Sequence, residues 1–152
     1  MELEEAKQKI FRYCAYQERC HSEVRNKLYE YGLFRADIDI VISGLITEGF
    51  LNEERFAKAF AGGKFRIKQW GKLKIQIELE SRGLTKNCIK IGLKEIDEGD
   101  YLKTLKGLIT KKRSQLDEEN TFVLRDKIAQ YVMQKGYEPE LVWTTLKSII
   151  PK

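Results

Sequence analysis

The chain has 152 residues, 42% hydrophobic and 34% charged, with 28 Lys and Arg against 23 Asp and Glu for a net charge of +5. This composition excludes a disordered chain, which would be less apolar, and a membrane-spanning chain, which would be less charged. The charge is unevenly placed: residues 1–54 carry a net −4, residues 55–94 a net +9 and residues 95–152 a net 0. A charge excess confined to the middle third favours binding to a polyanion or an acidic partner.

The N-terminus is acidic and no apolar run approaches the length of a membrane span. The three cysteines are an odd number without the spacing of a zinc or disulfide framework. We therefore expect a reduced, cytoplasmic protein that does not enter a membrane.

Apolar residues recur every three or four positions along the whole chain, which is the period of amphipathic helices and predicts an all-α fold. Helices are expected first over residues 3–16, then on either side of Gly32. A second helix group begins at 53–70 and continues around Gly83, and a third begins at 101–112 and continues around Gly136.

Those three glycines mark an internal sequence repeat. Apolar residues stand four and eight positions before each glycine and one position after it. A glycine in this pattern is expected just past a helix end, where the left-handed conformation costs it little. The predicted organisation is three tandem three-helix repeats over residues 1–50, 51–96 and 97–152.

Four residues are expected at helix starts. Ser22, Asn52 and Thr85 have side chains that cap helix N-termini, and Pro139 suits a first helical position. Glu53 and Glu54, next to Asn52, complement the helix dipole.

The segment from Lys64 to Lys74 contains five cations, no acid and interleaved aromatic residues. The helical stripe from Phe56 predicts that Ile67 and Trp70 face inward and that Phe65, off the stripe, is the better contact candidate. Gly62 and Gly63 are expected to loosen the helix at this point.

Catalysis is not expected. His21 is the only histidine, no Cys, His or carboxylate cluster has metal-ligand spacing, and no nucleotide-binding glycine loop is present. No cofactor or metal is implied.

Three segments resemble the RecX family of bacterial regulators of the RecA recombinase. The segment at 12–24 is similar to the family stretch in which a serine, here Ser22, opens the second helix. Residues 51–57 are similar to its "L-[ND]-D-x-R-[FY]-A" motif, and residues 71–83 to "G-x-x-[KR]-I-x-x-EL-x-x-[KR]-G". The motif positions with expected structural roles are Ser22, Asn52, Arg55, Phe56, Gly71 and Gly83.

The resemblance implies an elongated, curved molecule of three helical repeats. It also implies a negative regulator that binds the groove of the RecA–single-stranded-DNA filament and inhibits its ATPase, strand-exchange and coprotease activities in DNA repair and the SOS response. The chain would act as a monomer without a cofactor. Candidate filament or nucleic-acid contacts are Lys64, Arg66, Lys68, Lys72, Lys74, Arg82 and Lys86.

Two other interpretations stay open. One is a stand-alone helix-turn-helix-type DNA-binding module formed by residues 72–82 and 85–95. The other is a generic helical-repeat scaffold that binds no nucleic acid. For Arg55, a buried or inter-repeat ion pair is expected.

Overall fold

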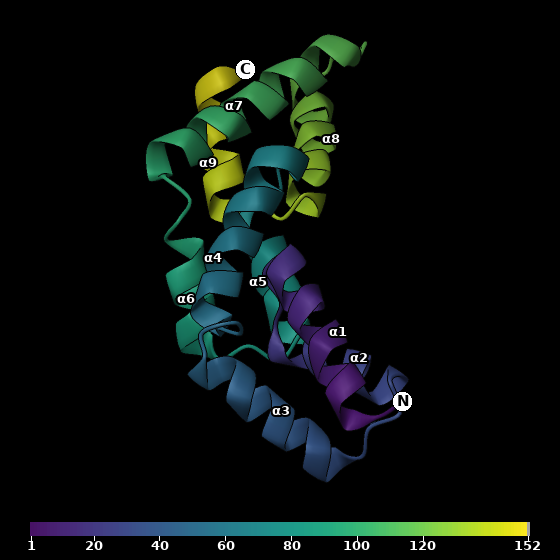
Figure 1. The fold of residues 1–152 in the computed structure, drawn as a ribbon. Helices are drawn as coiled ribbons and strands as arrows, with labels where there is room; N and C mark the ends of the chain where they lie inside the picture. Colours follow the sequence, from purple (N-terminus) through teal and green to yellow (C-terminus); the bar gives the residue numbers. More distant parts are fainter. Residues whose placement is uncertain (152) are drawn as a thin grey trace. The chain divides into compact units, whose positions relative to one another are not determined.

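The structure, a computed structural model, describes residues 1–151, and every regular element in that range is a helix. The all-α prediction is therefore confirmed. The helices labelled in Figure 1 are α1 Leu3–Tyr16, α2 His21–Glu30, α3 Arg35–Thr47, α4 Glu53–Gly63, α5 Lys72–Ser81, α6 Lys86–Leu93, α7 Glu98–Gln115, α8 Thr121–Gln134 and α9 Pro139–Ile149. A π-helical turn, η1 Lys64–Lys68, directly follows α4. None of these helices is long and apolar enough to cross a membrane.

The described chain divides into two compact units. Residues 1–59 and 79–92 form unit 1, and residues 60–78 and 93–151 form unit 2. The predicted second repeat, 51–96, thus contributes residues to both units. The division into three repeats remains a description of the sequence.

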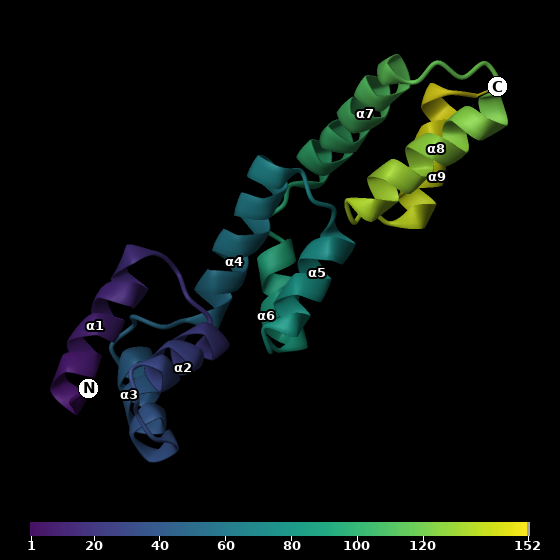
Figure 2. The ribbon, with the colours of Figure 1, turned by 90° about the vertical axis from the view of Figure 1, so that its right-hand side faces the viewer.

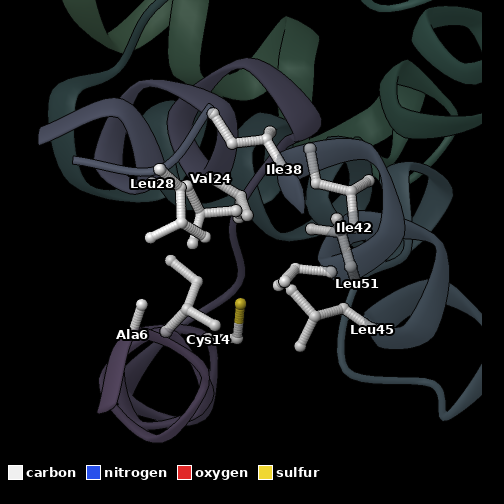
Figure 3. Close-up of a cluster of buried hydrophobic side chains, with 11 residues drawn as sticks. Ala6, Cys14, Val24, Leu28, Ile38, Ile42, Leu45 and Leu51 are labelled. Carbon is white, nitrogen blue, oxygen red and sulfur yellow. The ribbon is translucent and has the colours of Figure 1, made fainter. Parts of the chain in front are cut away.

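Unit 1 contains a core made by α1, α2 and α3, which pack against one another. Figure 3 shows apolar side chains from these three helices and from the segment after α3 pointing toward a common centre. Ile10, Val24, Leu28 and Ile38 are fully buried there, as the 3.6-residue period of each helix requires.

In unit 2, helices α7, α8 and α9 pack pairwise against one another, and Figure 2 shows them in green to yellow. Their core contains two tyrosines among aliphatic side chains. Tyr101 and Tyr137 are almost fully buried, with ring centroids 5.0 Å apart in a stacked arrangement.

The repeated glycine turn is confirmed at all three positions. Gly32, Gly83 and Gly136 have φ of 85°, 82° and 104°, in the left-handed region that favours glycine. The N–H of the following residue in each case donates to the carbonyl of the buried residue four before the glycine, as in Leu84 to Leu79 at 3.3 Å. This is the bond pattern of a glycine-terminated helix, so the three repeated glycines share the same local structure.

Three of the expected helix starts are confirmed. The Asn52 side-chain oxygen accepts the N–H of Arg55 at 2.9 Å, and the Thr85 hydroxyl accepts the N–H of Cys88 at 3.2 Å. Pro139 is the first residue of α9.

The assignment of Ser22 as an N-cap is wrong, because α2 begins one residue earlier and Cys20 is the flanking residue. The N–H of Cys20 donates to the carboxylate of Glu23 at 3.0 Å, so a glutamate inside the helix satisfies it. The Ser22 hydroxyl instead donates to the carbonyl oxygen of Arg82 at 3.0 Å. Ser22 therefore connects the start of α2 to the end of α5 within unit 1.

The predicted inward stripe is also wrong beyond Gly63. Ile67 is 80% exposed and Trp70 is half-buried, whereas Phe65 is buried. The reason is the π-helical turn η1, which holds more residues per turn than an α-helix and so changes which side chains face inward. The ring of Phe65 packs 5.9 Å from that of Tyr101, so Phe65 belongs to the core of unit 2.

Candidate nucleic-acid interface

Five of the seven candidate contact residues lie together in unit 2, on η1 and at the start of α5: Lys64, Arg66, Lys68, Lys72 and Lys74. Arg82 and Lys86 lie in unit 1. The structure thus brings together the uninterrupted basic run, and it assigns the last two candidates to the other unit.

The turn between η1 and α5 is fixed by backbone contacts to the end of α8. The N–H of Gly71 donates to the carbonyl of Lys135 at 2.7 Å, and the N–H of Leu73 donates to that of Gly136 at 2.9 Å. A β-carbon on Gly71 would lie 2.2 Å from the carbonyl carbon of Gly136. Only glycine allows this approach, which explains the motif glycine at position 71.

Gln69 occupies the left-handed conformation, with φ 58° and ψ 36°, directly before the turn. A non-glycine residue accepts this conformation at a cost that its surroundings must offset. The carbonyl of Gln69 accepts the hydroxyl proton of Tyr137 at 3.1 Å, and the Lys135 ammonium lies 3.4 Å from the carbonyl of Lys68. The corner of the chain that carries the basic residues is therefore held by the segment at residues 135–137, which follows α8.

Tyr101 links the same corner to α9. Its hydroxyl accepts the N–H of Lys72 at 2.9 Å and donates to the Glu138 carboxylate. Burial, reinforced by the hydrogen bond to Glu138, raises the pKa of Tyr101 well above its usual value. Burial likewise raises the pKa of Tyr137. Both phenols stay protonated and keep their hydrogen bonds at neutral pH.

The basic run divides into paired and unpaired cations. The ammonium of Lys72 forms an ion pair with Glu98 and its side chain is only 18% exposed, so its charge is largely neutralised. Within residues 1–151, no ion pair with a carboxylate is found for Lys64, Arg66, Lys68 or Lys74. Arg66 and Lys68 are exposed, and the Arg66 guanidinium packs back toward Gly62, where a β-carbon would be 2.7 Å away.

Trp70 organises two of the unpaired lysines. The ammonium nitrogens of Lys64 and Lys74 lie 5.0 and 4.6 Å from the centroid of its indole ring. Both distances are within the range of an attractive cation–π contact.

Sequence reasoning missed Lys135. It immediately precedes Gly136, the position that Arg82 occupies before Gly83, so the repeat itself contained the signal. The Lys135 ammonium donates to the carbonyl oxygen of Lys68, which places Lys135 beside the basic run. We call the set Lys64, Arg66, Lys68, Lys74 and Lys135 the basic corner.

The remaining motif residues stabilise unit 1. Arg55 donates to the Glu18 carboxylate at 2.5 Å and to the carbonyl of Gly49 at 2.9 Å. The pair joins the predicted repeats 1–50 and 51–96, so the inter-repeat alternative is confirmed. The buried alternative does not hold, because the Arg55 side chain is 44% exposed. Phe56 is buried, and Gly83 ends α5.

No group of three or more potential metal-ligating side chains occurs within residues 1–151. His21 lies beside Glu53, which accepts its backbone N–H at 3.0 Å and stands 3.7 Å from its ring nitrogen Nδ1. Cys20 is fully buried, and burial raises the pKa of its thiol, which disfavours the reactive thiolate form of this side chain.

Comparison with known proteins identifies the family. The family model described as the second three-helix domain of RecX matches residues 52–93, and the third three-helix domain matches residues 99–146. Together these matches cover more than half of the chain. This chain belongs to the RecX family.

Relatives across the RecX family match almost the full chain. "Regulatory protein RecX" of Geobacillus kaustophilus (strain HTA426) is 26% identical over 145 residues, which are 95% of this chain and 54% of that protein. The protein of the same name from Clostridium botulinum (strain Eklund 17B / Type B) is 27% identical over 134 residues, 87% of this chain and 62% of the relative. The chain spans about half the length of the first of these relatives.

The fold is that of solved RecX structures. The crystal structure of RecX from Lactobacillus salivarius superposes with a TM-score of 0.88 at 19% identity, covering 97% of this chain and 96% of that one. A second structure of "regulatory protein RecX" gives 0.85 at 18% identity, over 96% of this chain and 71% of that one. The RecX resemblance and the helical-repeat fold are both confirmed.

Proposed function

We propose that this RecX-family chain is a negative regulator of the RecA recombinase. It would bind in the groove of the RecA–single-stranded-DNA filament and lower the filament's ATPase, strand-exchange and coprotease activities, as part of DNA repair and the SOS response. The observation that carries the proposal is the basic corner, a set of unpaired cations on a fixed turn of a RecX fold. The chain would act as a cytoplasmic monomer, without a cofactor and without catalysis of its own.

The charge distribution supports a mixed interface. The net +9 of residues 55–94 suits contact with DNA phosphates, while the acidic residues 1–54 and the neutral residues 95–152 leave surface for contact with protein. Cations that neutralise phosphates release counterions, so binding should weaken as salt rises, with a slope of about −0.7 per phosphate on a single strand.

The decisive measurement is RecA ATPase on single-stranded DNA, titrated with this protein at ratios well below one per RecA. A filament regulator inhibits at these ratios, whereas a protein that merely competes for DNA needs excess. The double variant Arg66→Glu/Lys68→Glu should lose most of the inhibition. The matched control Lys103→Glu/Lys106→Glu reverses two exposed lysines on α7 and should keep it.

Both variants should melt close to the parent, because exposed cations contribute little to folding. Equal loss of inhibition in the two variants would mean that the footprint is not localised to the basic corner. Inhibition only at excess protein, with tight binding to free duplex DNA, would favour the stand-alone DNA-binding module. If the protein neither inhibits RecA nor binds DNA, the interpretation as a generic scaffold remains.

A further inference from the structure

Trp70 contacts two lysines of the basic corner, Lys64 and Lys74, and the motifs do not explain its role. It is half-buried, its ring meets that of Phe60 edge-on with centroids 6.4 Å apart, and it follows the left-handed residue Gln69. A large aromatic side chain placed only to fill a core would be expected to lie deeper. The Trp70 ring instead lies within cation–π distance of two lysine ammonium groups.

The two lysines reach Trp70 from different elements. Lys64 begins η1 and Lys74 belongs to the first turn of α5, ten positions later. The sum of their distances to the same ring centroid, 5.0 and 4.6 Å, is an upper bound on the separation of the two nitrogens. Two cations held around one ring are therefore close enough to contact phosphates that follow one another along a single strand.

Holding the lysines in advance changes the cost of binding. A free lysine side chain is flexible and loses rotamer freedom when a ligand fixes it. Tryptophan is the best cation–π partner among the aromatic residues, and Lys64 has a second ring, that of Phe60, at 5.5 Å. The indole therefore keeps both ammonium groups near their binding positions and leaves their outer N–H donors available for an anion.

We propose that Lys64 and Lys74, positioned by Trp70, form a cradle for the phosphodiester backbone of single-stranded nucleic acid. Trp70 is the positioning residue and the two lysines make the contacts. This assignment deepens the proposed function by naming phosphate-contacting residues in it, and it rests on that function for the identity of the strand as filament DNA.

The test is made without RecA, so that its outcome is independent of filament regulation. The affinity of the full chain for a fluorescein-labelled oligothymidylate is measured by anisotropy over a series of NaCl concentrations. Lys64→Gln/Lys74→Gln should flatten the salt slope by about 1.4, which is two phosphate contacts at about 0.7 each. The control Lys103→Gln/Lys106→Gln removes two exposed lysines of α7 and should leave the slope unchanged.

Trp70→Leu should behave differently, because it frees the lysines without removing them. Affinity should fall about five- to tenfold with the slope unchanged, and Trp70→Phe, which restores a ring, should recover most of the loss. Thermal melting identifies any variant that fails to fold. If Trp70→Leu does not fold, the affinities and salt slopes of Trp70→Phe and of Lys64→Gln/Lys74→Gln are compared instead.

Three results would overturn the cradle. They are parental affinity in folded Trp70→Leu, an unchanged slope in the lysine pair, and no oligothymidylate binding by the parent at low salt. If the parent binds the oligonucleotide as expected but does not inhibit RecA, the cradle stands and the proposed function fails.

Discussion

Arg55 shows how one side chain can connect three segments of the chain while remaining partly in solvent. Arg55 lies near the start of α4, and its guanidinium donates hydrogen bonds to the Glu18 carboxylate and to the carbonyl oxygen of Gly49. Its 44% exposure limits the strength of the ion pair, because water screens charges at the surface.

We expect Arg55→Ala to lower the free energy of unfolding by about 1 kcal/mol, far less than the roughly 3–5 kcal/mol lost when a buried pair is broken. Urea denaturation of Arg55→Ala, Glu18→Gln and the double variant gives the coupling between the two side chains. A coupling energy above about 3 kcal/mol would show that the pair behaves as a buried one.

Asn52 has a single identifiable role, acceptance of the Arg55 N–H at the start of α4. Asn52→Ala should cost about 1 kcal/mol in the free energy of unfolding, the usual value for a lost N-cap, whereas Asn52→Asp should keep the stability. Equal denaturation midpoints for the alanine variant and the parent would contradict this role.

At the scale of elements, the junction between the start of α5 and the end of α8 leaves no room for a side chain at Gly71. Gly71 has backbone atoms of Gly136 and Tyr137 where a side chain would begin. Helix packing alone could tolerate a methyl group by small shifts, but backbone atoms that also donate and accept hydrogen bonds cannot move apart cheaply.

Gly71→Ala should therefore destabilise the protein by several kcal/mol, of the order of about 3. Gly107→Ala is the matched control, because Gly107 lies within α7 with open space around its β position. That change should stabilise by about 0.5–1 kcal/mol, the difference in helix propensity. Equal effects of the two substitutions, measured by thermal melting, would rule out the close approach.

The elements themselves could be predicted because their signals are local. The glycine turns at Gly32, Gly83 and Gly136, the cap at Asn52 and the extent of α1 all depend on residues within one or two helical turns. Which side chains of residues 64–70 point into the core could not be predicted in the same way. A periodicity argument assumes 3.6 residues per turn, and the π turn η1 breaks that assumption.

The sequence predicted the location of the candidate site but not the contacts that each of its lysines makes. The sequence locates the positive charge, yet it does not show that Lys72 pairs with Glu98, 26 positions later, or that Lys135 approaches Lys68, 67 positions earlier. These pairings depend on tertiary packing, which sets the charge that each lysine actually presents to a ligand.

At the scale of the whole molecule, several buried acids make stability sensitive to alkaline pH. Burial raises the pKa of Tyr101 and Tyr137 above their ordinary value of 10.0 in unit 2, and that of the Cys14 and Cys20 thiols above 9.0 in unit 1. Each group is protonated in the folded state, while the unfolded chain loses the proton at the ordinary value. The stabilisation is therefore complete below pH 9 and declines as pH rises beyond it.

We expect the free energy of unfolding, measured in urea from pH 8 to pH 11, to be flat at first and then to fall. Tyr137→Phe removes one titrating group and should reduce the fall, although it costs some stability at neutral pH through the lost bond to Gln69. A profile that stays level to pH 11 would contradict the burial of these groups.

The path of the chain through its two units has a consequence for any attempt to dissect the protein. The backbone leaves unit 1 after Ala59, returns at Leu79 and leaves again after Gly92, so neither unit is a continuous stretch of sequence. Ending the chain at residue 50 would remove residues 51–59 and 79–92 from unit 1. Ending it at residue 96 would keep unit 1 but leave residues 60–78 of unit 2 without residues 97–151. Both fragments should therefore be sensitive to proteolysis. Because each unit draws on two separate stretches of sequence, neither can be obtained by cutting the chain once.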